Sequence, residues 1–246
     1  MTTHTTLDLS SVHPSWLTCL NNALAKMDSG YLQQLATSTE WLPGATKIFN
    51  AFSIPFTQTQ YVLLGESPYP RTESANGYAF WDASVNELWS SSGLSKKVNR
   101  ATSLRNMIKM LLIAEGLLDP QDLSQAAIAR INKASLIQSN QALFNHLLNH
   151  GFLLLNATLV LQSSAKTKDA RAWYPFIAEL LRCLLEARPQ IKLILLGQIA
   201  YAIEPLIKNH PTSKLYAEHP YNLSFITNPA ILAFFRPLHL LKPNSY

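Results

Sequence analysis

Short apolar runs alternate with longer amphipathic stretches along this chain of 246 residues. Four runs of strand length end abruptly in polar or turn-forming residues, and they occupy residues 61–64, 152–155, 193–196 and 214–217. Segments with helical spacing of apolar residues lie between them, at residues 104–118, 121–131, 141–150, 173–186 and 199–208. Continuous apolar strands are typical of a sheet that is covered on both faces. The alternation therefore predicts an α/β fold, with three α/β/α layers around a central, mainly parallel sheet of four strands.

The pattern runs through the whole chain without an internal repeat, a low-complexity segment or a linker rich in proline, glycine and serine. A chain of this length can bury one sizeable core. We therefore expect a single domain that spans residues 1–246.

Polar or glycine-rich residues follow each of the four predicted strands. The first strand leads into Gly65, the second into Asn156, the third into Gly197 and the fourth into Glu218. In open α/β sheets, ligands bind beyond the carboxyl ends of the strands. The four strand exits thus predict one crevice, and this crevice is the expected active site.

Charged residues are few in this sequence, and basic residues outnumber acidic ones. Charged residues make up 14% of the chain, and 20 Lys and Arg against 15 Asp and Glu leave a formal net charge of +5. The low charged fraction argues against a charged disordered tail or a coiled coil. The positive excess permits a polyanionic partner, although a mildly basic surface explains it equally well.

Cysteine and histidine usage exclude several kinds of site. Cys19 and Cys183 are the two cysteines, which is too few for a disulfide framework or a four-cysteine zinc or iron–sulfur site. His146 and His150 are four residues apart on a predicted helix, but no third ligand has a suggestive spacing, so we expect no metal. The glycines form no phosphate-binding loop with lysine and serine, so we expect no nucleotide cofactor.

The start of the chain is polar, and no apolar run approaches the length of a membrane span. These features predict a soluble, cytoplasmic protein without a membrane partner.

Five motifs in sequence order resemble those of the uracil-DNA glycosylases, over residues 41–241. Gly-Glu-Ser-Pro-Tyr-Pro at residues 65–70 is similar to the family's Gly-Gln-Asp-Pro-Tyr-His motif, and Phe80 has the spacing of its base-stacking phenylalanine. The run that begins at Ser103 resembles the end of the family's proline-rich loop. Asn156 ends a strand that resembles the one carrying the uracil-reading asparagine. Gly197 and Gln198 correspond to a Gly-Ser loop, and residues 219–224 resemble His-Pro-Ser-Pro-Leu-Ser.

The resemblance implies a DNA glycosylase of base-excision repair, a hydrolase that cleaves the N-glycosidic bond of flipped-out uracil without a cofactor or metal. Phe80 would stack on the base, and the Asn156 amide would pair with uracil O4 and N3–H. Tyr69 would exclude the methyl group of thymine. The substrate-binding residues implied are Glu66, Tyr69, Phe80 and Asn156.

Single- or double-stranded DNA containing uracil is the partner that the resemblance implies, and a monomer is expected to bind it, associated with the nucleoid if the source is bacterial. Leu223 would wedge into the duplex from the minor groove. Backbone amides and hydroxyl groups at Ser103, Gly197 and Ser224 would hold phosphates. The DNA-binding residues implied are Pro68, Arg71, Ser103, Arg105, Gly197, Gln198, Leu223 and Ser224.

Two groups of basic residues flank these DNA-binding positions. Runs of this kind occur on solvated faces as well, but their position beside loops expected to face DNA favours phosphate contact and salt-sensitive binding. The two groups are Lys96, Lys97, Arg100, Arg105 and Lys109, and Lys166, Lys168 and Arg171.

The catalytic residues implied by the resemblance are His219 and Ser67. His219 would donate a hydrogen bond to uracil O2 and stabilise the departing anion. Ser67 stands where the family has the aspartate that orients the attacking water, and a neutral hydroxyl cannot replace its charge. We expect weakened catalysis as a result. Glu66 is a possible substitute carboxylate, but adjacent residues that leave a strand point to opposite sides, which places Glu66 away from the Ser67 position.

Two alternatives remain open from the sequence. The chain could be a catalytically inactive protein that binds uracil-containing DNA or another partner, because Ser67 replaces the aspartate. It could also be a glycosylase for another modified base, with Tyr221 and Asn222 changing the wall behind His219. The sequence assigns no function to the additional helical material within residues 107–150, which could extend the core or bind a partner.

Overall fold

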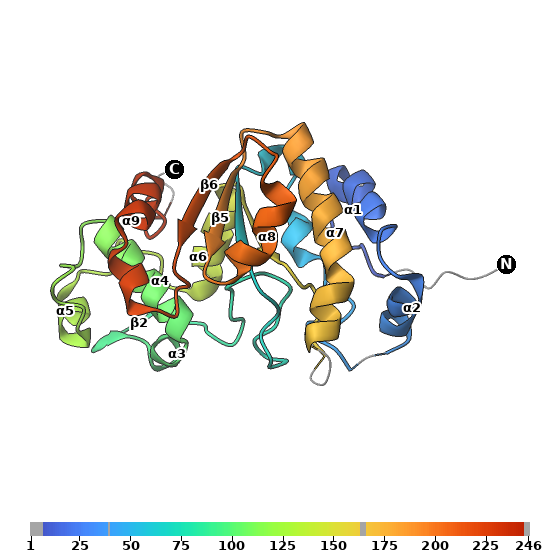
Figure 1. Cartoon of the computed structure of the whole chain (residues 1–246). Helices are drawn as coiled ribbons and strands as arrows, with labels where there is room; N and C mark the ends of the chain where they lie inside the picture. The colour runs from blue at the N-terminus through green and yellow to red at the C-terminus, as the bar shows by residue number, and fades with distance from the viewer. Residues whose placement is uncertain (1–6, 39, 163–165, 244–246) are drawn as a thin grey trace.

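A four-stranded parallel sheet forms the centre of the structure, a computed structural model that describes residues 7–38, 40–162 and 166–243 (Figure 1). The strand order is β4-β1-β5-β6, and every neighbouring pair is parallel. The predicted α/β/α architecture and all four predicted strands are confirmed. The strands are β1 (Tyr61–Gly65), β4 (Phe152–Asn156), β5 (Lys192–Leu196) and β6 (Ser213–Ala217).

The strand order brings segments that are distant in sequence to the same edge of the sheet. The chain passes from β1 to β4 on one side and then crosses β1 to form β5 and β6 on the other. Strand order therefore reverses between β1 and β5, which is where open α/β sheets bind their ligands. Gly65 pairs in register with Asn156, and Leu196 pairs with Ala217. All four strand exits consequently lie at one edge.

Residues that alternate along the strands enter two separate cores, one on each face of the sheet. Val62 and Leu64 belong to one core and Leu63 to the other, as the twofold period of a strand requires. In Figure 1, α7 and α8 lie on one side of the sheet, and α4 and α9 lie on the other. The helices of the first face are α1 (Leu17–Leu24), α2 (Ser29–Thr37), α7 (Lys166–Ala187) and α8 (Ile199–Ile207). Those of the second are α4 (Thr102–Ala114), α5 (Gln125–Arg130), α6 (Asn140–Asn149) and α9 (Pro229–Phe235).

Short elements complete the described part of the chain. A two-stranded antiparallel hairpin precedes the short helix α3, and 3-10 turns lie near both ends and before β1. These elements are β2 (Trp89–Ser90), β3 (Gly93–Leu94), α3 (Lys96–Arg100), η1 (Pro14–Trp16), η2 (Asn50–Ser53), η3 (Phe56–Gln58), η4 (Leu223–Thr227) and η5 (Arg236–Leu238).

Helix ends differ from the sequence-based boundaries where local capping decides them. The helix predicted to reach residue 118 ends at Ala114, and Gly116 follows with a left-handed φ of 72°. The helix predicted from residue 121 starts at Gln125, because the Ser124 side chain accepts a hydrogen bond from the Ala127 backbone. Helix α7 begins seven residues before the predicted start, in the turn that carries the buried Asp169.

The segment without a functional assignment extends the core. Ile128 of α5 is fully buried, and Leu136 and Ile137 are buried close to it in sequence. The Gln125 side chain accepts a hydrogen bond from the Leu94 backbone and so attaches α5 to the hairpin. This packing accounts for the additional helical material. None of the helices in the described ranges is long and apolar enough to cross a membrane.

We predict that Leu63→Ala lowers the free energy of unfolding by about 2–5 kcal/mol, because it leaves a cavity in a strand that is paired on both sides. Leu117→Ala is the matched control, since Leu117 is 36% exposed and its loss changes stability by about 0.5 kcal/mol or less. Urea unfolding of both variants measures the difference. Equal losses would contradict the assignment of Leu63 to the core.

Candidate active site

The end of β1 is packed too tightly to carry a side chain. A Cβ atom on Gly65 would lie 2.6 Å from the Asn156 Oδ1 atom and 2.9 Å from the Ala79 Cβ atom. The Ala79 backbone N–H donates to the Leu154 carbonyl at 3.0 Å, which attaches residues 76–80 to β4. Glycine at position 65 thus lets the Asn156 amide and the segment before Phe80 meet at one point.

The Asn156 side chain is buried and free of bonds to the protein. Asn156 is 4% exposed, and its amide makes no hydrogen bond within the residues that the structure describes. Buried amides are normally hydrogen-bonded, because an unpaired donor or acceptor costs about 1–3 kcal/mol. The free donor and acceptor of Asn156 are therefore available to a ligand at the sheet edge.

Phe80 adopts a strained backbone conformation that the partly buried Tyr69 supports. Its φ is 63°, in the left-handed region that a bulky residue rarely enters. The Tyr69 hydroxyl donates to the Phe80 carbonyl at 3.2 Å. Burial raises the pKa of Tyr69, with the nearby Asp82 carboxylate adding to the effect, so the hydroxyl stays protonated and remains a donor. Strain of this kind occurs mainly where the surrounding structure holds a residue in place for a ligand.

A salt bridge joins the loop after β1 to the segment after Phe80. The Arg71 Nη2 atom lies 3.1 Å from the Asp82 Oδ2 atom, and the Asp82 side chain is only 2% exposed. The Ser84 backbone N–H and hydroxyl donate to the other Asp82 oxygen. Arg71 was predicted to contact DNA, and the structure gives its guanidinium this internal partner while leaving the side chain 56% exposed.

His219 follows β6 and faces Phe80. The two ring centroids are 5.8 Å apart, with an angle of 34° between the rings. The Tyr221 backbone N–H donates to the His219 Nδ1 atom at 3.1 Å, so the proton of the neutral ring is on Nε2. Burial lowers the pKa of His219, and the Glu66 carboxylate opposes this shift. The neutral ring, with Nε2–H as a donor, is therefore the form favoured near pH 7.

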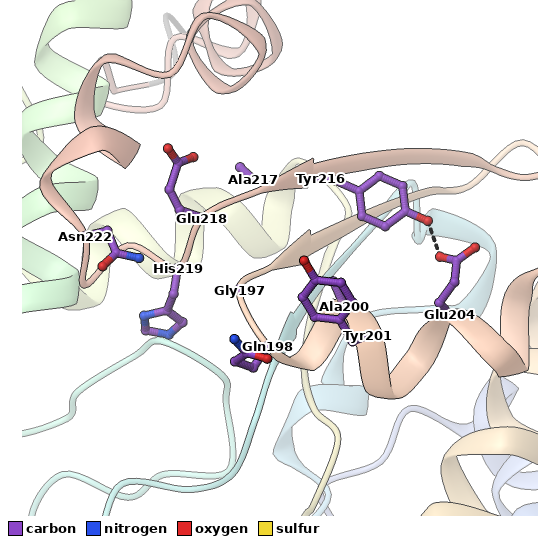
Figure 2. A pocket seen from close by; sticks show the side chains of 10 residues that line it. All are labelled: Gly197, Gln198, Ala200, Tyr201, Glu204, Tyr216, Ala217, Glu218, His219 and Asn222. Atoms are coloured by element: carbon purple, nitrogen blue, oxygen red, sulfur yellow. Dashed lines mark hydrogen bonds between the residues drawn. The ribbon is translucent and has the colours of Figure 1, made fainter.

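A second glycine allows the loop after β5 to approach this histidine. Gly197 has a φ of 71°, and a Cβ atom there would lie 2.7 Å from the His219 Cβ atom. Its N–H donates to the Ala217 carbonyl at 2.9 Å. Figure 2 shows Gln198 close to His219, and it shows the imidazole and the Glu218 carboxylate pointing in opposite directions from the chain.

Asn106 of α4 holds the loop that carries His219, and the sequence reasoning did not single it out. It is fully buried, and its Nδ2 atom donates to the Pro220 carbonyl at 2.7 Å and to the Tyr221 carbonyl at 3.3 Å. The available signal was an asparagine on the apolar face of an amphipathic helix, between Leu104 and Met107. Such a residue needs a partner, and here the partner is the backbone of the loop that carries His219.

The remaining predicted DNA-binding residues surround this site on several elements. Leu223 is 69% exposed, and Ser224 and Gln198 are exposed as well. Ser103 lies in the first turn of α4, which has no side-chain cap. Pro68 is buried within the loop after β1.

The basic residues differ in exposure, and several of them donate hydrogen bonds within the protein. Arg105 donates to the Asn99 carbonyl at 3.0 Å, and Lys109 donates to the Leu123 carbonyl at 2.8 Å. The exposed cations of the first group are those of α3, namely Lys96, Lys97 and Arg100, although Lys97 also donates to the Ser84 carbonyl at 2.7 Å. In the second group, Lys168 and Arg171 are exposed on α7.

The proposed catalytic position Ser67 is partly exposed, and within the described ranges its hydroxyl has no hydrogen-bonding partner. Glu66 beside it is exposed, and its charge reaches His219. Among the described residues, no three His, Cys, Asp or Glu side chains gather as metal ligands. The arrangement therefore offers an unpaired amide, an aromatic face and a neutral imidazole donor, which together fit a planar, polar ring.

Comparisons with known proteins agree on one family. Residues 53–242 match the model of the uracil DNA glycosylase superfamily. The chain is 30% identical over 212 residues to a uracil-DNA glycosylase of Phocaeicola vulgatus, covering 85% of this chain and 80% of that protein. It is 27% identical to a uracil-DNA glycosylase of Amoebophilus asiaticus, covering 96% and 94% of the two chains. The crystal structure of wild-type UNG from Nitratifractor salsuginis superimposes with a TM-score of 0.91 at 39% identity, covering 96% and 95%.

We predict that Asn106→Ala lowers the free energy of unfolding by about 1–3 kcal/mol, because it leaves the buried Pro220 carbonyl and the partly buried Tyr221 carbonyl without this partner. The Tyr221 amide should also exchange with solvent faster, since its loop loses an anchor. Asn145→Ala, on the exposed side of α6, is the matched control. Unchanged exchange at Tyr221 would contradict the anchoring role of Asn106.

Proposed function

The chain belongs to the uracil DNA glycosylase superfamily, and from this premise we propose that it hydrolyses the N-glycosidic bond of uracil flipped out of DNA. One observation carries the proposal: the free amide of Asn156, the Phe80 ring and the Nε2–H of His219 meet at the carboxyl edge of the sheet. Enzymes that act on a base must extrude it and read its Watson–Crick edge in a fitted site. These three groups supply the contacts that such a site needs.

Asn156 and Phe80 recognise the base. An amide has one acceptor and one donor side, which match the N3–H and O4 of uracil, whereas cytosine presents an acceptor and an amino donor at these positions. Phe80 provides the stacking face, and its strained backbone fixes where that face lies. Tyr69 stands beside Phe80 and supports the exclusion of a C5 methyl group.

His219 stabilises the leaving group. Bond cleavage leaves negative charge on the departing uracil, and a donor aimed at O2 lowers the energy of that charge. Because the Tyr221 N–H occupies Nδ1, the remaining Nε2–H is the donor to O2. The depressed pKa of His219 means that a neutral imidazole performs this role.

Catalysis at the sugar is weakened by Ser67. A serine hydroxyl can hold the attacking water by a hydrogen bond, but it neither takes its proton near pH 7 nor offsets the positive charge that develops on the deoxyribose. The Glu66 carboxylate acts electrostatically on His219 and therefore on the leaving-group side of the site. We infer that Glu66 does not substitute for the missing aspartate.

DNA is held by the exposed residues around the site. Leu223 enters the duplex, and Gln198, Ser224, Gly197 and the first turn of α4 at Ser103 contact phosphates. The exposed cations of α3 add a salt-dependent attraction. We also propose that residues 1–246 act as one unit and as a monomer, in the cytoplasm.

A second candidate function rests on Ser67 alone: a protein that binds uracil-containing DNA and does not hydrolyse it. The third, a glycosylase for another base, has less support, because of the two residues it rests on only Asn222 lines the groove beside His219. The Tyr221 side chain is 66% exposed and so does not form a buried wall behind His219.

We predict that Ser67→Asp raises the rate of uracil release from DNA on the order of 10²-fold, because it adds a water-orienting carboxylate. Ser67→Asn is the matched control, because asparagine has the shape of aspartate without its charge, and it should leave the rate low.

We predict that His219→Ala lowers kcat by about 10²–10³-fold, the usual loss for one donor to a developing anion. Abasic sites in single- and double-stranded uracil-DNA are measured. Tight binding with no release by any variant would favour the second candidate, and release of another base alone would favour the third.

We predict a pH profile whose acid limb lies below about pH 6.5, the value expected for an unperturbed histidine. The neutral form of His219 is the active one, so activity is lost as pH falls through its lowered pKa. Glu66→Gln removes a charge that raises this pKa, and the acid limb should therefore move to still lower pH. Measurement of kcat/KM against pH in the two proteins tests this. If the acid limb of Glu66→Gln moves to higher pH, Glu66 does not raise the pKa of His219.

A further inference from the structure

A groove of about 770 Å³ lies beside His219, between β6 and α8, and the proposed catalytic chemistry does not use it (Figure 2). Its walls include Gly197 and His219 together with two tyrosines and two carboxylates: Tyr201, Tyr216, Glu204 and Glu218. A volume of this size holds a small organic group, within the range of about 300–1,000 Å³ typical of ligand pockets. Because it shares Gly197, Gln198 and His219 with the site, whatever enters it lies next to the nucleotide bound there.

Exposed apolar side chains gather around this groove. Within the described ranges, seven large apolar side chains are exposed, and four of them lie between residues 201 and 223. Tyr201 is 77% exposed and Tyr216 is 47% exposed, and both line the groove. Exposed aromatic faces beside a nucleic-acid site are the surfaces on which single-stranded bases stack.

Tyr216 is held in position by its neighbour. Its hydroxyl donates to the Glu204 carboxylate, which also pairs with Lys214 at 3.6 Å (Figure 2). A ring that is fixed before binding loses less conformational freedom when a ligand stacks on it. The groove therefore presents an ordered aromatic wall.

The two carboxylates decide which part of DNA can enter. Glu218 accepts from the Asn228 amide at 2.7 Å, and hydrogen bonding by its own backbone N–H and the Ser224 side chain lowers its pKa, so it is ionised at neutral pH. Ionised carboxylates repel phosphate. They accept hydrogen bonds from the amino groups of bases, as in contacts of Glu or Asp with cytosine N4. The groove thus favours a base and disfavours the backbone.

We propose that this groove binds a nucleobase next to the uracil on the same strand, stacked on Tyr201 and Tyr216, when the DNA is single-stranded. The inference rests on the proposed function, since it requires uracil-DNA as the ligand. In a duplex the neighbouring base is paired and stacked, so its face is not available to the groove. The consequence is tighter binding of single-stranded than of double-stranded substrate by this surface.

The first test compares Tyr201→Ala with wild type on an oligonucleotide that contains one 2′-fluorinated deoxyuridine, a substituent that slows glycosidic cleavage. Loss of a base–aromatic stack should weaken single-strand binding about tenfold and leave duplex binding unchanged. Tyr201→Phe retains the ring and should retain affinity. Tyr174→Ala, an exposed tyrosine on α7 outside the groove, is the matched control. Equal losses on both forms of DNA would overturn the proposal.

The second test is a double-mutant cycle between the protein and the DNA. An abasic spacer replaces in turn each base next to the uracil, on the 5′ and the 3′ side. At one position, removing the base should weaken binding to wild type about tenfold and have little effect on Tyr201→Ala, because both changes delete the same stack. Additive losses at every position would refute the contact.

Controls separate this inference from the proposed function. If wild type releases no uracil and binds no uracil-DNA, the proposed function fails. If wild type releases uracil and the cycle is additive, only the groove assignment fails. Spermidine binding is measured as well. If spermidine binds wild type and not Tyr201→Ala, and if the abasic spacers do not change DNA binding, the groove is a cation site and the assignment is overturned.

Discussion

The close approach of backbone and side chains at the carboxyl edge of the sheet is the constraint on which the whole site depends. At Gly65 there is no space for even one carbon atom between β1, the Asn156 amide and Ala79. At Gly197 the same holds against His219. These two glycines allow groups from four distant parts of the chain to meet, and a methyl group at either position would separate the amide from the aromatic face or the histidine from the strand exit.

The electrostatics of the site follow from the same packing. Burial lowers the pKa of His219, and the Tyr221 N–H leaves its Nε2–H as the donor, so the proposed stabilisation of a leaving anion needs no proton transfer from the histidine. The loop after β1 contributes Glu66 on the side of His219 and a neutral hydroxyl at Ser67. In the proposed mechanism, stabilisation of the departing anion therefore rests on the Nε2–H donor of His219, and Ser67 offers no negative charge to the positive charge that develops on the sugar.

Contacts that involve buried polar groups connect the loops of this site. Asn106 fixes the His219 loop through two carbonyl groups, and the Arg71–Asp82 salt bridge joins the loop after β1 to the Phe80 segment. The Asn106 contact joins residues 114 positions apart, and the salt bridge joins residues 11 positions apart through the buried Asp82 carboxylate. A buried polar group that loses its partner is costly. The two tyrosines of the adjacent groove differ from these buried groups, because Tyr201 is 77% exposed and Tyr216 is 47% exposed.

Sequence alone determined the strands, the α/β/α class and the strand exits, because continuous apolar runs bounded by turn residues have few other ways to fold. The ordered motifs brought Asn156, Phe80, Tyr69 and His219 into one hypothesis. Only the tertiary structure decided what these residues do to one another: which nitrogen of His219 carries the proton, which partner Arg71 takes, and how Asn106 anchors the loop. Asn106 and Pro220 are 114 positions apart, and even the nearer pairs Arg71–Asp82 and His219–Tyr221 form only because their loops bend back in space. A pattern of apolar and polar residues contains no information on such contacts.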